Sequence, residues 1–269
     1  MLWLSPALGY DPPVTDWGML AGSRRGFAFP ETCRTHSSAS LIPVIYALRV
    51  WLTDRPGALG AVAGSIGSVG GDLVGIDILE RGGGRAIDEL IVSLQNESDL
   101  DLLIAGLSKL DGVDVEDARV AGDGVADPRL DALETAAALV TKNAVGPLLS
   151  SLATSSRRDF QGDWATVVDP DAAELRSSVG TVPPGAWLKA FLAGSRASVA
   201  PRSGDGGPDD VAWADLDVAG LVLVVGRQGR PFRLRERRQL SALARIADAR
   251  WAELTARAPR RSWQLSGPN

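Results

Sequence analysis

The chain has 269 residues, of which 45% are hydrophobic and 23% are charged, and its net charge is −5 at pH 7. This composition is typical of a globular protein, and the length suffices for two domains of ordinary size. The acidic balance gives no overall footprint for nucleic-acid binding, and no apolar run reaches the roughly 20 residues of a membrane-spanning helix. A single cysteine excludes an intrachain disulfide and favours a reducing compartment, so we expect a cytoplasmic protein.

Residues 1–43 carry Pro, Gly, Ser and Thr without hydrophobic periodicity, which predicts a disordered tail or upstream sequence included by an early start assignment. The only cysteine and the only histidine of the chain, Cys33 and His36, lie in this segment. The segment supplies too few further ligands for a metal site and no partner for a catalytic pair. We therefore expect neither a metal site nor a cofactor.

Residues 46–71 contain the clearest local pattern in the chain. Apolar residues alternate along 46–52, as in a half-buried strand, and from Leu59 they recur at three- and four-residue steps, as on one face of a helix. The connection is Asp-Arg-Pro-Gly at 54–57, in which Pro56 suits a helix start and Gly57 permits close approach to the backbone. The unpaired N–H groups at such a helix start can hold a carboxylate.

The segments up to residue 120 complete one compact unit. Alternating patterns predict strands at 73–80, 86–94 and 113–120, and a helix is predicted at 99–110 with Ser98 or Asp99 as its N-cap. Asp88 and Glu89 are neighbours on a strand and therefore face opposite sides, so they are not a catalytic pair. The order βαββαβ within about 75 residues is that of a ferredoxin-like unit.

After a linker at 121–128, residues 129–257 are expected to form a second domain, followed by a flexible tail at 258–269. Its predicted elements are a helix at 130–152 that Gly146-Pro147 must kink or end, a strand at 164–168, a helix at 187–192, strands at 211–216 and 221–225, and a helix at 234–256. The stretch 169–210 lacks strand signals and includes a loop at 201–208. The large aromatics are expected in the core: Trp164, Trp187, Trp213 and Phe232. The whole chain is thus predicted to be α+β.

Residues 44–120 resemble an ACT domain, the small ligand-binding module of amino-acid metabolism. The resemblance is carried by Asp54-Arg55-Pro56-Gly57 after an alternating strand, then by Leu59-Gly60-x-Val62-Ala63, and by the element order. It implies that an amino acid binds between two such modules, with the polar backbone of the ligand in the loop and the second strand of a partner closing the site. The implied ligand-binding residues are Asp54, Arg55, Pro56, Gly57, Ala58 and Leu59 of the loop, and Ile76, Asp77 and Ile78 of the strand.

Two features of this unit permit more than one interpretation. Asp54 can meet the ammonium group of an amino acid, or it can simply cap the helix or order the turn. The glycines at 57, 60, 64, 67 and 70 recur at three- and four-residue steps and lack the G-x-G-x-x-G spacing of a dinucleotide-binding turn. They therefore predict a surface for close packing of another helix or backbone, as in a dimer, rather than a nucleotide site.

Residues 129–257 are similar to a GAF domain, a sensory α/β module with a central antiparallel sheet. The similarity is carried by the apolar strand 221–225, the connection from Gly226 to Phe232, and the apolar face of the last helix: Leu240, Leu243, Ala244 and Ala247. No cysteine is present here to attach a bilin, and we find no cyclic-nucleotide signature. The shortage of strand signals in 169–210 indicates a reduced pocket.

Charge is distributed unevenly along the chain. Eleven arginines and three acidic residues lie between Arg227 and Arg261, whereas residues 46–120 carry thirteen acidic and six basic side chains. The arginines are predicted to form a solvated face or to pair with acidic residues of the neighbouring domain. Nucleic-acid binding is the less favoured alternative, because no helix-turn-helix or aromatic RNA-binding motif accompanies them.

An enzyme is not expected, because no Ser-His-Asp or metal-ligand set can be drawn outside the tail. We expect a non-catalytic regulatory protein that binds an amino acid through an ACT-like homodimer and passes the signal through the GAF-like module. Two alternatives remain: a dimerisation scaffold without a ligand, and a regulatory subunit of an amino-acid biosynthetic enzyme. The expected partners are an amino acid, a second copy of the chain and an enzyme or signalling protein, with no membrane.

Overall fold

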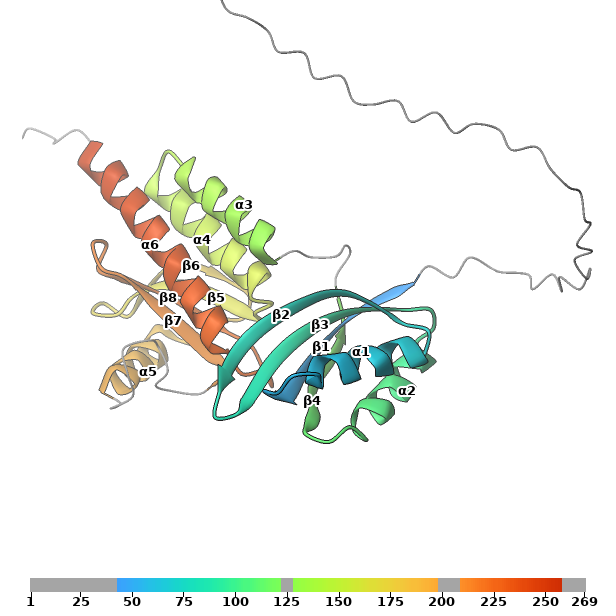
Figure 1. Cartoon of the computed structure of the whole chain (residues 1–269). Helices are drawn as coiled ribbons and strands as arrows, with labels where there is room; N and C mark the ends of the chain where they lie inside the picture. The colour runs from blue at the N-terminus through green and yellow to red at the C-terminus, as the bar shows by residue number, and fades with distance from the viewer. Residues whose placement is uncertain (1–42, 122–127, 198–208, 258–269) are drawn as a thin grey trace, which may run out of the picture. The chain divides into compact units, whose positions relative to one another are not determined.

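The computed structural model describes residues 43–121, 128–197 and 209–257. These residues form two four-stranded sheets in which every pairing is antiparallel, with helices packed on them (Figure 1). The α+β class predicted from the sequence is therefore confirmed. The predicted tail at 1–43 and linker at 121–128 lie almost entirely outside the described residues, as do Cys33, His36, the loop at 201–208 and the tail at 258–269.

The first sheet has the strand order β2-β3-β1-β4, so the first and third strands of the unit are central. With one helix after β1 and one after β3, this is the ferredoxin-like arrangement that the sequence predicted. Its elements are β1 (Val44–Thr53), α1 (Ala58–Ser68), β2 (Asp72–Gly82), β3 (Arg85–Leu94), α2 (Ser98–Leu107) and β4 (Val113–Val120). The helix at 98–107 starts earlier than expected, and neither Ser98 nor Asp99 is its N-cap, which is Glu97 without a side-chain cap.

The two faces of this sheet differ in chemistry because side chains alternate along each strand. Tyr46, Leu48, Val50 and Leu52 of β1 are buried in one cluster with Leu90, Val92 and Leu94 of β3 and with residues of α1 and α2. The other face of the same two strands carries Arg49 opposite Glu89 and Trp51 opposite Ile87. One face thus forms an apolar core under the helices, and the other presents charge.

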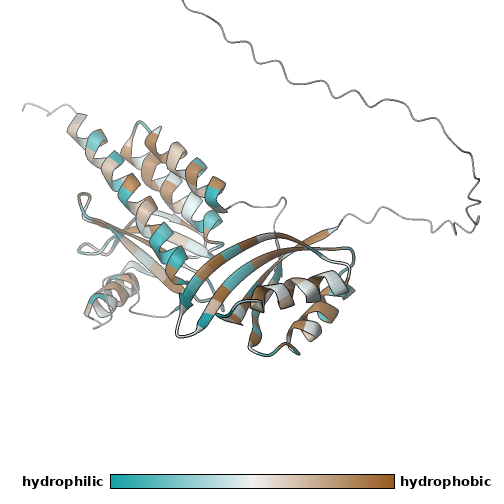
Figure 2. Cartoon of the chain, viewed as in Figure 1, coloured by the Kyte–Doolittle hydropathy of each residue, from teal (hydrophilic) through white to brown (hydrophobic). Residues whose placement is uncertain are grey.

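The second sheet has the strand order β6-β5-β8-β7. Figure 2 shows hydrophobic residues along the central strand β8, whereas the edge strand β6 carries Glu174 and Arg176. Its elements are α3 (Pro128–Val140), α4 (Val145–Asp159), β5 (Trp164–Asp169), β6 (Glu174–Val179), α5 (Gly185–Ala197), β7 (Val211–Leu216), β8 (Leu221–Gly226) and α6 (Leu234–Arg257). The predicted strands at 164–168, 211–216 and 221–225 and the final helix are confirmed, whereas a GAF relationship is not established by these elements.

Helices cover both faces of this second sheet, which explains the uninterrupted apolar run of β8. Leu221, Leu223 and Val225 lie in a core cluster with apolar residues of α3, α4 and α6. Val222 and Val224 lie in a separate cluster with Leu188 and Leu192 of α5. The predicted core face of the last helix is confirmed, since Leu240, Leu243, Ala244 and Ala247 are all buried in the first of these clusters.

Three expectations for this half were wrong. The helix at 130–152 is two helices, and the break at 141–144 precedes Gly146-Pro147, so that Pro147 sits in the first turn of α4, where its missing N–H costs nothing. The stretch 169–210 contains the strand β6, which was not predicted. Trp187 is 44% exposed and stacks on Phe191 at 5.3 Å between ring centroids, so it is not a core residue.

We predict that Leu152→Ala lowers the free energy of unfolding by about 2–5 kcal/mol, because Leu152 is completely buried between α4 and the second sheet. The measurement is urea denaturation followed by circular dichroism. Leu133→Ala on α3 is the matched control, since Leu133 is 67% exposed. A change of more than about 0.5 kcal/mol in the control, or none in Leu152→Ala, would contradict the observed packing.

Candidate functional site

The loop between β1 and α1 lies at the end of the first sheet, beside the turn that joins β2 to β3. The backbone N–H of Asp54 donates to the carbonyl of Gly84 at 2.9 Å, and that of Arg55 donates to the carbonyl of Thr53 at 2.8 Å. Asp54, Arg55, Pro56 and Gly57 are all exposed. The loop residues predicted from the sequence are therefore held in place by backbone bonds while their surface stays accessible.

The start of α1 has no side-chain cap, although the N–H of Ala58 donates to the carbonyl of Arg55 at 3.3 Å. Gly57 is the N-cap residue of α1 and adopts a left-handed conformation with φ of 88°, which glycine tolerates without strain. No side chain makes a capping hydrogen bond there, and the first turn contains no acidic residue. Asp54 therefore does not cap the helix, which removes one of its two interpretations. The first-turn N–H groups keep the partial positive charge that favours an anion.

The predicted strand residues divide between the two faces of the sheet. Ile76 pairs with Leu90 and Ile78 with Asp88, so both lie on the helix-covered face, where they are 41% and 39% exposed because β2 is an edge strand. Asp77 pairs with Glu89 on the opposite face and forms an ion pair with Arg235 of α6. Only Ile76 and Ile78 share a face with α1, and the ligand roles of all three remain predictions.

A buried carboxylate that was not predicted as a site residue lies in the half of the first sheet that is nearer to the loop between β1 and α1. Asp88 occupies the apolar face of β3, between Val50 of β1 and Ile78 of β2, and is only 4% exposed. Its Oδ1 atom is buried and has no hydrogen-bond partner. Burial raises the pKa of Asp88, nearby Arg81 opposes that rise, and the carboxylate of Asp54 adds to it. A charged residue in the alternation Ala86-x-Asp88-x-Leu90 was the sequence signal for this site.

The opposite face of the sheet is bound to α6 through Arg49, whose side chain is 1% exposed. Its Nη1 donates to the carbonyl of Pro231 at 3.0 Å, and its Nη2 lies 3.4 Å from Glu236 and 3.5 Å from Glu89. A buried guanidinium is tolerated only when carboxylates and carbonyls satisfy it. The sequence placed Arg49 on this face of β1 but gave no indication of these partners.

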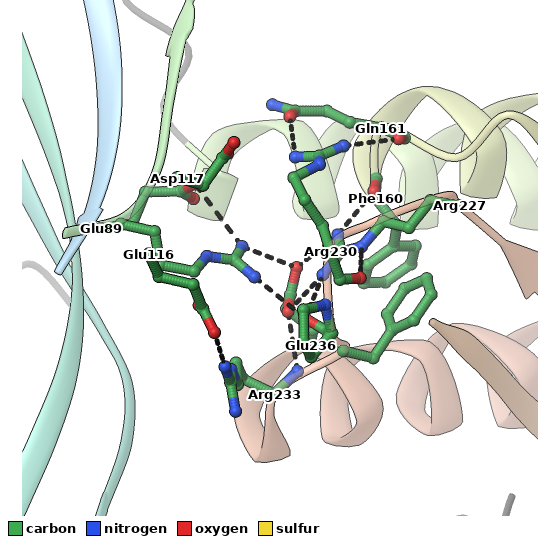
Figure 3. Close-up of polar contacts among 12 residues, drawn as sticks. Glu89, Glu116, Asp117, Phe160, Gln161, Arg227, Arg230, Arg233 and Glu236 are labelled. Carbon is green, nitrogen blue, oxygen red and sulfur yellow. Dashed lines mark hydrogen bonds and ion pairs between the residues drawn. The ribbon is translucent and has the colours of Figure 1, made fainter. Parts of the chain in front are cut away.

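Glu236 is the centre of this arrangement (Figure 3). Its carboxylate accepts two hydrogen bonds from Arg227, at 2.7 and 2.8 Å, and one from the backbone N–H of Arg233 at 2.8 Å. Burial alone would raise the pKa of Glu236, but Arg227, Arg49 and the backbone bond hold it below its usual value. Arg227 in turn donates to the carbonyl of Phe160 at 2.9 Å, with its guanidinium over the ring of Phe232.

A second set of contacts surrounds Gln161, which follows α4 and joins Arg230 in Figure 3. Its side-chain oxygen accepts from Arg119 at 2.8 Å and from Arg230 at 2.9 Å, and its backbone carbonyl accepts from Arg230 at 2.9 Å. Arg119 also donates to Glu89 at 2.7 Å and to Asp117 at 2.8 Å. Burial and the neighbouring cations Arg119 and Arg227 lower the pKa of Arg230 to about 10.

Two further arginines of the same region pair with acidic residues of the first sheet. Arg233 forms an ion pair with Glu116, and its guanidinium lies 5.0 Å from the ring centroid of Trp51. Arg235 pairs with Asp77. The expectation that these arginines bind acidic residues of the neighbouring domain is therefore confirmed for Arg233 and Arg235. We call the contacts centred on Glu236, Gln161 and these two pairs the arginine network.

The glycine stripe of α1 has no neighbour within the described chain. A Cβ atom built at Gly57, Gly60, Gly64, Gly67 or Gly70 would meet no atom within 4 Å.

Among the described residues, no group of three or more His, Cys, Asp or Glu side chains is placed to hold a metal ion. None of the helices in the described part of the chain is both long and apolar enough to cross a membrane.

No protein-family model and no curated protein matches this sequence. A crystal structure of the ACT domain from GTP pyrophosphokinase of Chlorobium tepidum is similar at 19% identity, over 30% of this chain and 100% of that one, with a TM-score of 0.25. A solution structure of the same domain gives 18% identity, 32% and 93% coverage and a TM-score of 0.25. A crystal structure of an unknown protein from Galdieria sulphuraria is similar at 15% identity, over 38% of this chain and 66% of that one, with a TM-score of 0.26. The ferredoxin-like assignment rests on the strand order described above.

We predict that Glu236→Gln lowers the free energy of unfolding by about 3 kcal/mol, because two buried guanidinium groups lose their shared counterion. The measurement is urea denaturation at pH 7. Glu253→Gln is the matched control, since Glu253 pairs with Arg250 but is 55% exposed. Equal effects of the two variants would show that the arginine network adds nothing to stability.

We also predict that the stability of the wild type depends on pH more strongly than that of Glu236→Gln. The pKa of Glu236 is lower in the folded state than in the unfolded chain. The stabilisation that its carboxylate provides is therefore complete above the usual pKa of 4.5 and is lost progressively as the pH falls below that value. Between pH 6 and pH 3.5 the unfolding free energy of the wild type should therefore fall more steeply than that of Glu236→Gln. Parallel pH profiles would contradict the depressed pKa.

Proposed function

We propose that this chain is a non-catalytic regulatory protein that binds an amino acid through its ACT-like unit. The observation that carries the proposal is the start of α1 without a side-chain cap, behind an exposed loop whose backbone is held at Gly57 in the left-handed region. The resemblance of this loop to the ACT loop supports a small-molecule role for it. The single cysteine supports a cytoplasmic location.

The site can supply the elements that a zwitterion requires. First-turn N–H groups favour a carboxylate by about 0.3–1 kcal/mol at an exposed position, which is too little for binding without further contacts. In the proposal, the exposed apolar side chains Ile76 and Ile78 of a second copy cover the side chain of the amino acid. Asp77 is the weakest member of the proposed set, because its carboxylate is already paired with Arg235.

The arginine network suggests how binding would reach the second half of the chain. The strands β1 and β3 carry the loop and Asp88 at one face and Arg49 and Glu89 at the other. A shift of either strand on ligand binding would therefore change the distance of Arg49 and Glu89 from Glu236 and Arg119. The ligand can move this equilibrium only by as much as its affinities for the two arrangements differ. In this proposal, the GAF-like half of the chain receives the signal of ligand binding and passes it on.

The alternative is a dimerisation scaffold or a regulatory subunit that needs no ligand of its own. The exposed apolar row on the edge strand β2, Val74, Ile76 and Ile78, favours it, because such a row is a surface for protein contact. The two functions differ in whether a small molecule stabilises the protein.

The deciding experiment is a thermal-shift panel of the twenty amino acids on the full chain. An amino acid present at one hundred times its dissociation constant adds about 2.7 kcal/mol to the folded state. We expect a shift with one or a few amino acids. A flat panel from a folded, dimeric protein would favour the scaffold.

We predict that Gly60→Glu abolishes this shift while leaving the protein at least as stable as the wild type. A Cβ at Gly60 faces open space, and a carboxylate at the third helical position reaches back to the N-cap N–H, where it competes with the ligand. Gly60→Gln is the matched control without the charge. Retained binding in Gly60→Glu, or equal loss in both variants, would remove the helix start from the proposal.

A further inference from the structure

Asp88 is the one buried carboxylate of the first sheet's core for which neither the fold nor the arginine network provides a partner. It lies among apolar residues, with Val50 and Leu90 on the same face and both completely buried. A buried carboxylate oxygen without a hydrogen-bond donor is costly in free energy, so its presence in a folded protein requires an explanation, of which a bound ligand is one. The raised pKa of Asp88 has burial as its first cause, in keeping with that cost.

The position of Asp88 relates it to the start of α1. Asp88 is the fourth residue of β3, whose beginning lies at the same end of the sheet as the end of β1. The N–H of Asp54 bonds to Gly84 at this end, and the chain then enters α1, whose Val62 and Ile66 lie in the core cluster on the same face. The carboxylate of Asp88 and the first-turn N–H groups of α1 are thus brought to one end of one face.

These two groups have opposite charge preferences. The helix start attracts an anion, and a buried carboxylate attracts a cation with several N–H donors. We propose that Asp88 binds the α-ammonium group of an amino acid whose carboxylate lies at the start of α1. This assignment rests on the function proposed above and names the residue that would make the site selective for amino acids over other carboxylic acids.

Asp88 suits this role better than Asp54, for which the sequence left an ammonium contact open. Asp54 is exposed, and an ion pair in water contributes little. Asp88 has an unpaired oxygen in a dry position, so an α-hydroxy acid of the same shape would leave its charge without a cation. Arg81 is the cation that opposes the raised pKa of Asp88, but its residue is exposed and no hydrogen bond joins the two side chains.

The test compares amino acids with their α-hydroxy acids, such as alanine with lactate and glycine with glycolate, by thermal shift and calorimetry on the full chain. The wild type should bind the amino acid on the order of tenfold to a hundredfold more tightly than the hydroxy acid. Asp88→Asn should lose that difference while its thermal midpoint without ligand stays the same or rises, because the buried Oδ1 of Asp88 has no hydrogen bond to lose and the cost of burying its charge is removed. Asp72→Asn is the control and should keep the discrimination of the wild type, since Asp72 is an exposed carboxylate at the other end of the sheet and lies outside the proposed site.

The outcomes separate this inference from the function on which it rests. If no amino acid and no hydroxy acid stabilises the wild type, the proposed function fails and the assignment of Asp88 fails with it. If amino acids bind but the wild type does not distinguish them from hydroxy acids, or Asp88→Asn retains the difference, the function stands and Asp88 is not the ammonium site. Should Asp88→Asn fail to fold, equal binding of alanine and lactate by the wild type, or loss of the discrimination in Asp54→Asn, would still overturn the assignment.

Discussion

The contact between the first sheet and the second half of the chain depends on the ion pairs that the Glu236 carboxylate makes with Arg49 and Arg227. The carboxylate lies within 3.4 Å of Arg49 and accepts two bonds from Arg227, and these two guanidinium groups are almost completely buried. Neither arginine could remain there without it, because an unpaired buried cation costs several kcal/mol. Glu236 also occupies the third position of α6 and accepts from the N–H of Arg233, so one side chain both begins the helix and attaches it to the first sheet.

The first sheet separates two kinds of chemistry by the alternation of its strands. On β3, Asp88 faces α1 and the apolar core, and Glu89, the next residue, faces Arg49 and Arg119. The carboxylate of Glu89 on one face accepts a hydrogen bond from Arg119, while the neighbouring carboxylate of Asp88 on the other face has a buried oxygen without a hydrogen-bond partner. This contrast within two residues is the reason to look for a ligand on the helix-covered face and for a mechanical connection on the other.

Periodicity predicted those elements whose two faces differ in polarity. The strands of the ferredoxin-like unit and the last helix were found in this way, since each has a continuous apolar side. β6 was missed because Glu174, Leu175 and Arg176 are all exposed on an edge strand, so no apolar alternation marks it. The break between α3 and α4 was placed too late, because Pro147 was interpreted as a helix breaker although it stands where a helix begins.

The sequence by itself determined the element order, the apolar faces, the DRPG loop at a helix start and the opposite charges of the two halves. Only the tertiary structure decided which charges meet: Arg49 and Glu236 are 187 residues apart, and Arg235 and Asp77 are 158 apart. Local patterns depend on neighbours three or four residues away, so they contain no information on such pairs. For the same reason the isolation of Asp88 became visible only when strands β1 and β2 were placed on either side of it.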